Sequence, residues 1–350
     1  MTVLRKPFEI AHHSIKPGER QLLHLGLPRL ITNNPIGLPV HVLHGRREGP
    51  VLFVSAAVHG DELNGVEIIR RLLAIKSLRA LHGTLLAAPM VNVYGTLNNS
   101  RYLPDRRDLN RSFPGSGRGS MASRLADTFM KEVVKQCNYG IDLHTGAINR
   151  SNLPQIRADL DDAEINELAH AFGVPVLLNA GLREGSLRAV AADRGVKVLV
   201  YEAGEALRLD EVSIRAGLHG ILNVMRAIGM LKTRRRRKPS EPFVARSSSW
   251  VRAGDSGLFH ARIDLGGVVK QGEHIGSVFD PVTGEEDQVL APFRGVIIGR
   301  NVHPLVHEGE AVFHVARFGN ELRDVADELE SFSQEFDPDV ILPTDEPPVV

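Results

Sequence analysis

The sequence contains a single cysteine, Cys137, among its 350 residues. One cysteine excludes a disulfide framework and any metal site built from several thiolates. This usage fits a reducing cytosol, and the first ten residues contain no apolar core of signal-peptide length. We therefore expect a cytoplasmic protein.

The chain also lacks a net charge and long apolar runs. Its 42 Lys and Arg residues balance 42 Asp and Glu residues, so there is no global attraction to nucleic acid or to an anionic membrane. No apolar run approaches the ~18 residues of a membrane span. The one basic run, at residues 232–240, has no interleaved aromatic residues and is interpreted as a solvated linker. Neither nucleic acid nor a membrane is an expected partner.

Apolar runs of strand length alternate with segments of helical periodicity over the first two-thirds of the chain, which predicts a mixed, mostly parallel sheet flanked by helices. The expected strands are residues 51–54, 83–91, 138–143, 174–178 and 197–201, and the expected helices are residues 64–73, 120–136, 161–172 and 210–231. Glycine-separated β-like runs then predict a smaller all-β domain. The expected divisions are a large α/β domain at residues 1–232, a basic linker at 233–246, the β domain at 247–317 and an acidic tail at 318–350.

His59 and Glu62 lie between an expected strand and an expected helix, where α/β sheets build their sites. We hypothesise that both are ligands of one metal ion. The His-x-x-Glu spacing alone is a weak signal, because His307 and Glu310 repeat it. That second pair falls in a glycine-rich turn with no helix after it, so we interpret it as surface.

Two further expected strands end at His144 and at Glu202. Two histidines and one carboxylate leave a fourth position open for water, as in hydrolytic zinc sites, although a buried histidine satisfied by the backbone is the alternative for His144. Asp142 shares a strand face with His144 and could orient its imidazole. A carboxylate at position 202 could move protons to and from the reacting groups. Glu205 is the competing candidate for that role.

Four short motifs together resemble those of the succinylglutamate desuccinylase/aspartoacylase family, which is related to the zinc carboxypeptidases. They are His-Gly-Asp-Glu at 59–62, Asp-Leu-Asn-Arg at 108–111, Asp-Leu-His at 142–144 and Glu-Ala-Gly at 202–204. The resemblance covers roughly residues 40–230. It implies one Zn²⁺ per chain, a homo-oligomer and a zinc carboxypeptidase-like fold. The implied metal ligands are His59, Glu62 and His144, and the implied catalytic carboxylate is Glu202.

The resemblance also assigns roles in the long loop that carries the second motif. Asn110 and Arg111 would hold the substrate carboxylate, which suits the planar fork of a guanidinium. Another loop arginine would polarise the scissile carbonyl. Arg101 is our choice for this role, while Arg106 and Arg107 stay open as alternatives.

Two aspartates within the motifs are expected to support the site. Asp108 is expected to brace its loop, and Asp61 is expected either to brace His59 or to cap the following helix. The two roles of Asp61 cannot be separated by sequence alone.

The β domain resembles a biotinyl/lipoyl-type hammerhead. Such carriers need a lysine at the hairpin tip, and the matching turn, residues 280–284, has none. We therefore expect no attached cofactor, and instead a wall of the active site or an oligomer contact.

The resulting hypothesis is a zinc-dependent deacylase acting on a small N-acyl amino acid. Zn²⁺ would polarise the amide carbonyl and lower the pKa of its bound water to ~7, Glu202 would act as base and then acid, and Arg101 would help stabilise the oxyanion. The alternatives are a carboxypeptidase on short peptides and an inactive metal- or ligand-binding protein. The sequence of residues 201–205 resembles that of the family branch that includes ectoine-degradation deacetylases, which act on acetylated diaminobutyrate.

Overall fold

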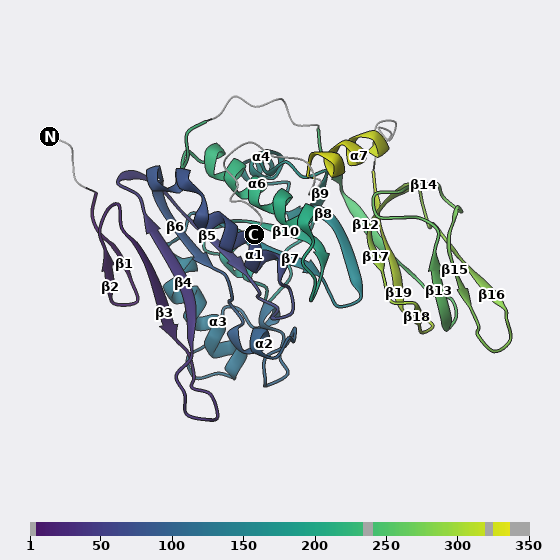
Figure 1. The fold of residues 1–350 in the computed structure, drawn as a ribbon, viewed down its shortest axis with the longest axis horizontal. Helices are drawn as coiled ribbons and strands as arrows, with labels where there is room; N and C mark the ends of the chain where they lie inside the picture. The colour runs from purple at the N-terminus through teal and green to yellow at the C-terminus, as the bar shows by residue number, and fades with distance from the viewer. Residues whose placement is uncertain (1–4, 234–240, 319–324, 337–350) are drawn as a thin grey trace.

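A computed structural model describes residues 5–233, 241–318 and 325–336 (Figure 1). Residues 234–240 of the expected basic linker and residues 319–324 and 337–350 of the expected acidic tail lie outside these residues. None of the described helices is long and apolar enough to cross a membrane.

One sheet of 13 strands runs through most of the molecule. Its centre is parallel, with β5 between β6 and β7, and β10 on the other side of β7. Antiparallel strands extend both edges, which confirms the expected mixed sheet. The strands of the first part are β3 (Arg20–Gly26), β4 (Gly37–His44), β5 (Arg47–Ala56), β6 (His82–Ala88), β7 (Tyr139–Gly146), β8 (Arg150–Ala158), β9 (Val176–Asn179) and β10 (Lys197–Glu205), with a separate hairpin of β1 (Phe8–Ile10) and β2 (His13–Ile15).

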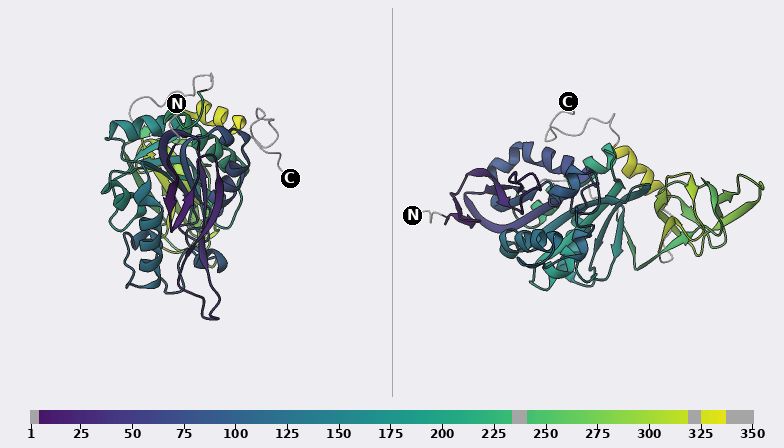
Figure 2. Two further views of the ribbon diagram at one scale, coloured as in Figure 1. Left: turned by 90° about the vertical axis from the view of Figure 1, so that its left-hand side faces the viewer. Right: turned by 90° about the horizontal axis from the view of Figure 1, so that it is seen from below.

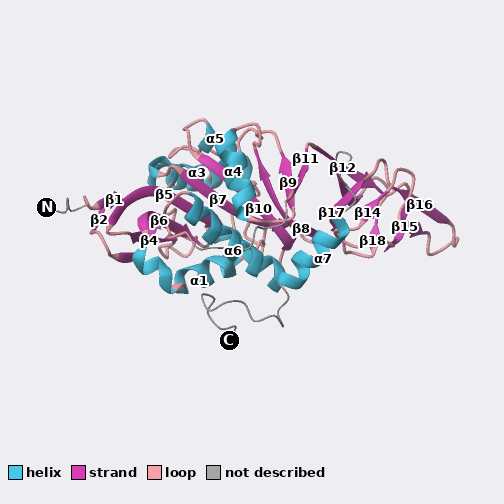
Figure 3. Ribbon diagram, turned by 90° about the horizontal axis from the view of Figure 1, so that it is seen from above, coloured by secondary structure: helices cyan, strands magenta, loops and turns pink. Residues whose placement is uncertain are grey.

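Helices cover both faces of this sheet, with α1 and α6 on one side and α3 and α5 on the other (Figure 3). Strand alternation divides the apolar residues of β5 between the two sides, because Val54 belongs to the core under α1 and α6 while Phe53 packs on α3. The helices are α1 (Asn64–Ala74), α2 (Val93–Leu97), α3 (Met121–Glu132), α4 (Ala163–Phe172), α5 (Leu187–Ala192), α6 (Glu211–Ala227) and α7 (Val325–Glu335), and the short 3₁₀ helices are η1 (Lys76–Ala80), η2 (Leu109–Arg111) and η3 (Val134–Gln136).

Side-chain caps explain several helix starts. Ser120 accepts a hydrogen bond from the backbone N–H of Ser123 at the start of α3, and Asp162 does the same for Ile165 in α4. The expected helix 120–136 is in fact α3 followed by η3, and the final helix ends at Ala227 rather than at residue 231.

The C-terminal residues form antiparallel β structure, seen at the right of Figure 1 and projecting from the rest in Figure 2. Part of it extends the main sheet, because β17 pairs with β8. The boundary at residue 247 therefore stays a prediction, since one sheet crosses it. The strands are β11 (Phe243–Ala245), β12 (Ser247–Arg252), β14 (Val268–Val269), β17 (Gly295–Asn301) and β19 (Ala311–Arg317) in the main sheet, and β13 (Gly257–Ala261), β15 (His274–Phe279), β16 (Glu286–Leu290) and β18 (Leu305–Val306) in a second sheet.

Candidate active site

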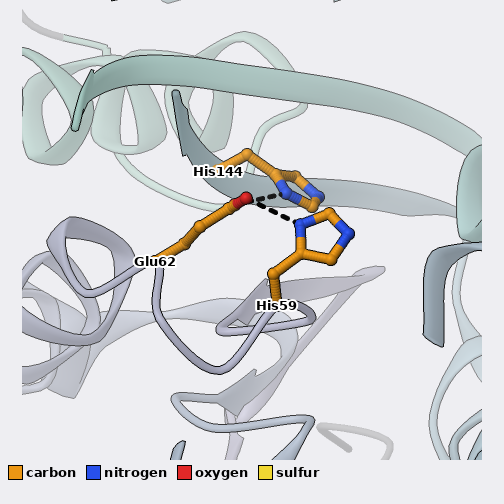
Figure 4. A group of neighbouring side chains, drawn as sticks. All are labelled: His59, Glu62 and His144. Carbon is orange, nitrogen blue, oxygen red and sulfur yellow. Dashed lines mark hydrogen bonds and ion pairs between the residues drawn. The ribbon is translucent and has the colours of Figure 1, made fainter. Parts of the chain in front are cut away.

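Three of the predicted site residues meet at the carboxyl ends of β5 and β7. One ligand atom each from His59, Glu62 and His144 lies within 4.8 Å of the others, and all three residues are buried. Nδ1 of His59 is 2.7 Å from Oε1 of Glu62, and Nδ1 of His144 is 2.7 Å from Oε2 of the same carboxylate (Figure 4). This set could hold a metal ion.

Each imidazole has a second carboxylate at its other nitrogen. Nε2 of His59 lies 3.2 Å from Oδ1 of Asp108, and Nε2 of His144 lies 2.8 Å from Oδ2 of Asp142. An Nε2–H that donates to such an oxygen leaves Nδ1 free as a metal ligand, which is how outer carboxylates orient ligand histidines. The position of Asp142 agrees with the role expected for it.

The three clustered side chains perturb one another's protonation. Burial disfavours the charged form of each imidazole, but neighbouring carboxylates more than offset this effect. Glu62 and Asp108 raise the pKa of His59, and Asp142 and Glu62 hold the pKa of His144 well above its usual value. Burial likewise acts against the Glu62 carboxylate, yet the two histidines hold its pKa below its usual range. Without metal the cluster retains protons on its imidazoles, and a divalent cation would replace them.

Close packing fixes the turn between His59 and α1. A Cβ at Gly60 would lie 2.0 Å from the backbone carbon of Gly95, so only glycine fits where this turn crosses α2. Glu62 lies in the turn before the helix, because its N–H bonds to the His59 carbonyl and α1 begins at Asn64. The turn brings Glu62 back toward His59 and sets the ligand spacing.

Asp61 does not cap α1, which begins after Leu63 with no side-chain cap. Its Oδ1 is buried without a hydrogen-bond partner, and burial raises the pKa of the carboxyl. Its carbonyl oxygen accepts a hydrogen bond from the N–H of Leu207, which ties the turn to the loop after β10.

Glu202 enters the same cavity, whose volume is about 450 Å³. It pairs with His144 across the parallel β10–β7 ladder, so both side chains leave the sheet on one face. Both strands continue beyond these residues, to Glu205 and Gly146, instead of ending at them as predicted. Oε2 of Glu202 accepts a hydrogen bond from Nδ2 of Asn152 at 2.8 Å. Glu205 instead accepts one from the backbone N–H of Asn149 and does not line the cavity.

Arg101 lines the cavity next to the ligand set. Its Nη2 is 2.9 Å from Oδ2 of Asp108, and its Nη1 is 3.4 Å from Oε1 of Glu62. The competing Arg106 and Arg107 are exposed and do not line the cavity, because a turn closed by backbone bonds between Leu103 and these two residues directs them outward.

Asn110 and Arg111 also line the cavity, from η2. Asp108 fixes this segment as expected, because its Oδ1 accepts the N–H of Asn110 at 2.8 Å. The Asn110 side chain accepts the N–H of Leu187 at 2.9 Å and thereby joins the loop to the start of α5. Its amide nitrogen and the Arg111 guanidinium are the groups available to a ligand from this segment.

Several cavity residues were not predicted from the sequence, because they lie outside the four motifs. The lining contains six arginines against the three carboxylates of Glu62, Asp142 and Glu202, so the cavity favours an anionic ligand. The additional lining residues include Arg150, Asn152, Arg157, Arg183, Arg188 and Trp250. Trp250 belongs to β12, so the C-terminal β structure contributes to the cavity wall. No local spacing in the sequence marks these residues, since separate strands and loops supply them.

The chain is similar in sequence and in fold to several known proteins. The chain is 29% identical over 293 residues to an N-α-acetyl-L-2,4-diaminobutyric acid deacetylase of Halomonas elongata, covering 80% of this chain and 85% of the relative. Its fold is similar to a product-bound structure of the ectoine utilization protein EutE (DoeB) from Ruegeria pomeroyi, with a TM-score of 0.79 and 24% identity over 89% of this chain and 99% of the other. It is also similar to a succinylglutamate desuccinylase/aspartoacylase from Rhodobacter sphaeroides, with a TM-score of 0.77 and 24% identity over 86% and 96% of the two chains.

A family model settles the relationship that the motifs suggested. The succinylglutamate desuccinylase/aspartoacylase catalytic domain matches residues 48–228, which is just over half of the chain. The expectation of an amide-hydrolysing enzyme is confirmed at the level of this family. The chain belongs to the succinylglutamate desuccinylase/aspartoacylase family.

Proposed function

We propose that this chain is a zinc-dependent deacylase that hydrolyses the amide bond of a small N-acyl amino acid. The observation that carries the proposal is a buried two-histidine, one-carboxylate donor set that shares an arginine-rich cavity with the carboxylate of Glu202. Family membership alone would give the reaction class, whereas the donor set and the charge of the cavity argue for the metal and for an anionic substrate.

His59, Glu62 and His144 fit one Zn²⁺ ion. Two imidazole nitrogens and a carboxylate oxygen make up a hydrolytic zinc site that keeps a position open, and the outer carboxylates Asp108 and Asp142 already turn both Nδ1 atoms inward. A zinc ion held there would polarise an amide carbonyl and acidify water.

Glu202 is the proposed general base and acid. It stands on the same face as His144, and its carboxylate is held by Asn152 and lies 3.3 Å from Nε of Arg157 through Oε1. A carboxylate fixed in this way can accept a proton from the attacking water and return it to the leaving nitrogen.

Arginines would hold the two ends of the reacting group. Arg101 stands beside Glu62 and would donate to the carbonyl oxygen as negative charge develops there. Arg111, with the Asn110 amide, would bind the substrate carboxylate, because a guanidinium pairs with a carboxylate through two parallel hydrogen bonds.

We propose N-α-acetyl-L-2,4-diaminobutyrate as the first substrate to test, because a relative that shares 29% identity is named as its deacetylase. We also propose that the enzyme acts in the cytoplasm and as a homo-oligomer, as the sequence suggested. Sedimentation of the purified protein would measure its oligomeric state.

The test is a hydrolysis panel on zinc-loaded protein that contains N-acetyl amino acids, N-succinyl amino acids and dipeptides. We expect an N-acyl amino acid to be the preferred substrate. A preference for dipeptides would instead indicate a carboxypeptidase, and no hydrolysis anywhere in the panel would support an inactive binding protein.

Glu202→Gln tests the mechanism within that panel. The amide keeps the shape and its contact with Asn152 but cannot accept the proton, so we expect full zinc occupancy and a loss of about 10²–10⁴-fold in kcat. Glu205→Gln is the matched control, since that carboxylate lies outside the cavity lining, and it should retain activity. Substantial turnover by Glu202→Gln would remove Glu202 from its assigned role.

A further inference from the structure

Trp250 reaches the cavity along a row of paired residues that crosses four strands. It pairs with His314 of β19, His314 pairs with Gly299 of β17, and Gly299 pairs with Asn152 of β8. Asn152 in turn holds the carboxylate of Glu202. The row therefore connects the C-terminal β structure to the proposed catalytic carboxylate.

The indole ring of Trp250 is held by its neighbours. It stacks on the His314 ring with centroids 4.4 Å apart and planes inclined by 10°, and the Arg150 guanidinium carbon lies 5.3 Å from its centroid. Stacking and cation–π contacts of this kind favour one ring orientation.

His314 is itself a fixed platform for this ring. Burial, with a smaller contribution from Arg157, lowers the pKa of His314 to about 3, so the ring is neutral at physiological pH. Its Nε2 lies 2.9 Å from the hydroxyl of Ser248.

Gly299 leaves room for the indole next to Asn152. A Cβ at this position would lie 3.0 Å from Oδ1 of Asn152 and 3.7 Å from Cη2 of Trp250. The ring edge of Trp250 therefore extends over a residue without a side chain and borders the space beside Asn152. This explains how a residue three strands away from β8 lines the cavity.

The charged residues indicate which end of the cavity Trp250 borders. Arg111 interacts electrostatically with Asp108, Arg183 and Arg101, and Asp108 contacts Nε2 of His59. Trp250 lies beyond Glu202 and Asn152, past β10 in the strand order. Because Arg111 lies near the contact between Asp108 and His59, and Trp250 lies on the other side of Glu202, a substrate with its carboxylate at Arg111 and its scissile carbonyl at the three clustered side chains would extend its acyl group toward Trp250.

We infer that Trp250 forms the end wall of the acyl side of the cavity and restricts the acyl group to a short chain. This inference rests on the proposed function and adds a specificity-determining residue from the C-terminal β structure. A longer acyl chain would have to displace a ring that His314 and Arg150 hold in place.

The test compares N-acetyl, N-propionyl and N-butyryl derivatives of L-2,4-diaminobutyrate on wild type, Trp250→Phe and Trp250→Ala. One methylene in an apolar pocket changes kcat/KM by about 10–200-fold. We expect the butyryl-to-acetyl ratio of kcat/KM to rise at least about 10-fold in Trp250→Ala, with a smaller rise in Trp250→Phe. An unchanged ratio in a folded Trp250→Ala protein would overturn the inference.

Phe293→Ala is the matched control. Phe293 also belongs to the C-terminal β structure and also has an arginine over its ring, with the Arg317 guanidinium carbon 4.3 Å from its centroid, but it does not line the cavity. This variant should keep the wild-type ratio. A shift of equal size in Phe293→Ala would show that loosening of the β structure, and not the loss of a wall, changes the selectivity.

A second measurement does not depend on activity. Trp250 is the only tryptophan in the sequence, so tryptophan fluorescence reports on this position alone. In the arginine-rich cavity, iodide should quench its emission more strongly than caesium at equal ionic strength, each quenching constant being taken relative to that of free N-acetyltryptophanamide. Equal quenching would remove Trp250 from the cationic cavity. Absence of hydrolysis by wild type together with selective iodide quenching would instead refute the proposed function and leave the placement of Trp250 intact.

Discussion

Asp142→Asn tests whether the carboxylate behind His144 tunes a metal site. Asp142 is 1% exposed, and its two oxygens are divided between Nε2 of His144 at 2.8 Å and the hydroxyl of Ser55 at 2.7 Å. An asparagine can keep its oxygen on His144 and direct its amide at the Ser55 hydroxyl, which rotates to accept. The substitution therefore removes the negative charge while keeping the shape.

Asp142→Asn is expected to weaken zinc binding. Loss of such an outer partner weakens metal binding by about 10–100-fold, and at about 1.4 kcal/mol per tenfold this corresponds to about 1.4–2.8 kcal/mol. Complete burial and the short contact favour the upper part of this range. His144→Ala removes the ligand itself and should cost more, so full zinc occupancy in that variant would count against His144 as a ligand.

Chelator competition measures the affinities, and the pH of the assay matters. Metal-free His144 has a raised pKa that depends partly on Asp142, so protons compete with zinc more strongly in wild type than in Asp142→Asn. This competition masks part of the defect at pH 7, and the difference between the two proteins should grow at pH 8.5. Ser55→Ala is the control, because it keeps the charge of Asp142 and should change affinity far less. An Asp142→Asn protein that binds zinc as tightly as wild type at pH 8.5 would refute the reasoning.

Two other residues give separate predictions. Arg101→Ala should lower kcat by about 10²-fold or more with zinc retained, because it removes a donor aimed at the developing oxyanion. Arg107→Ala, at an exposed position outside the cavity, should match wild type in steady-state kinetics. An equal loss of kcat in both variants would contradict the role assigned to Arg101. Asp162→Ala should lower the free energy of unfolding by about 1 kcal/mol through loss of the α4 cap, measured by urea denaturation. Lys197 and the helix N–H hold the pKa of Asp162 below its usual 3.8, so the stability carried by its charge is present above that pH and is lost as pH falls through the lowered value. Asp162→Asn keeps a capping side chain without the charge, and its difference from wild type should shrink on acidification from pH 6 to pH 3; a difference that stays constant would show that the charge contributes nothing.

The cluster of three residues that could hold a metal was predictable because its signals are local in the sequence. His59 follows a β-branched run, and His144 and Glu202 fall near the carboxyl ends of two others, so strand polarity alone puts them at one edge of a parallel sheet. The exact strand ends were not predictable, because β7 and β10 support each other for several residues beyond the ligand positions through pairing that runs to Glu205 and Gly146. A residue's place in such a ladder depends on its partner strand and not on its own neighbours in sequence.

Tertiary contacts show which of the candidate residues line the cavity. Sequence left Arg101, Arg106 and Arg107 open, and the turn that directs the last two outward separated them. Glu202 and Glu205 are separated in the same way. Glu205 lies three residues further along the chain, where its carboxylate accepts a hydrogen bond from the backbone N–H of Asn149.

By itself the sequence determined the fold class, the family motifs and the residues of the donor set, since each depends on periodicity or on short spacings along the chain. Only the tertiary structure decided how the donors are oriented by Asp108 and Asp142, and that four further arginines and Trp250 complete the cavity. Those residues come from β8, β12 and the segment around the start of α5, and only sheet pairing across the molecule brings them to one place. The side chains that could hold a metal thus come from short local motifs, whereas the shape and charge of the cavity around them arise from long-range packing.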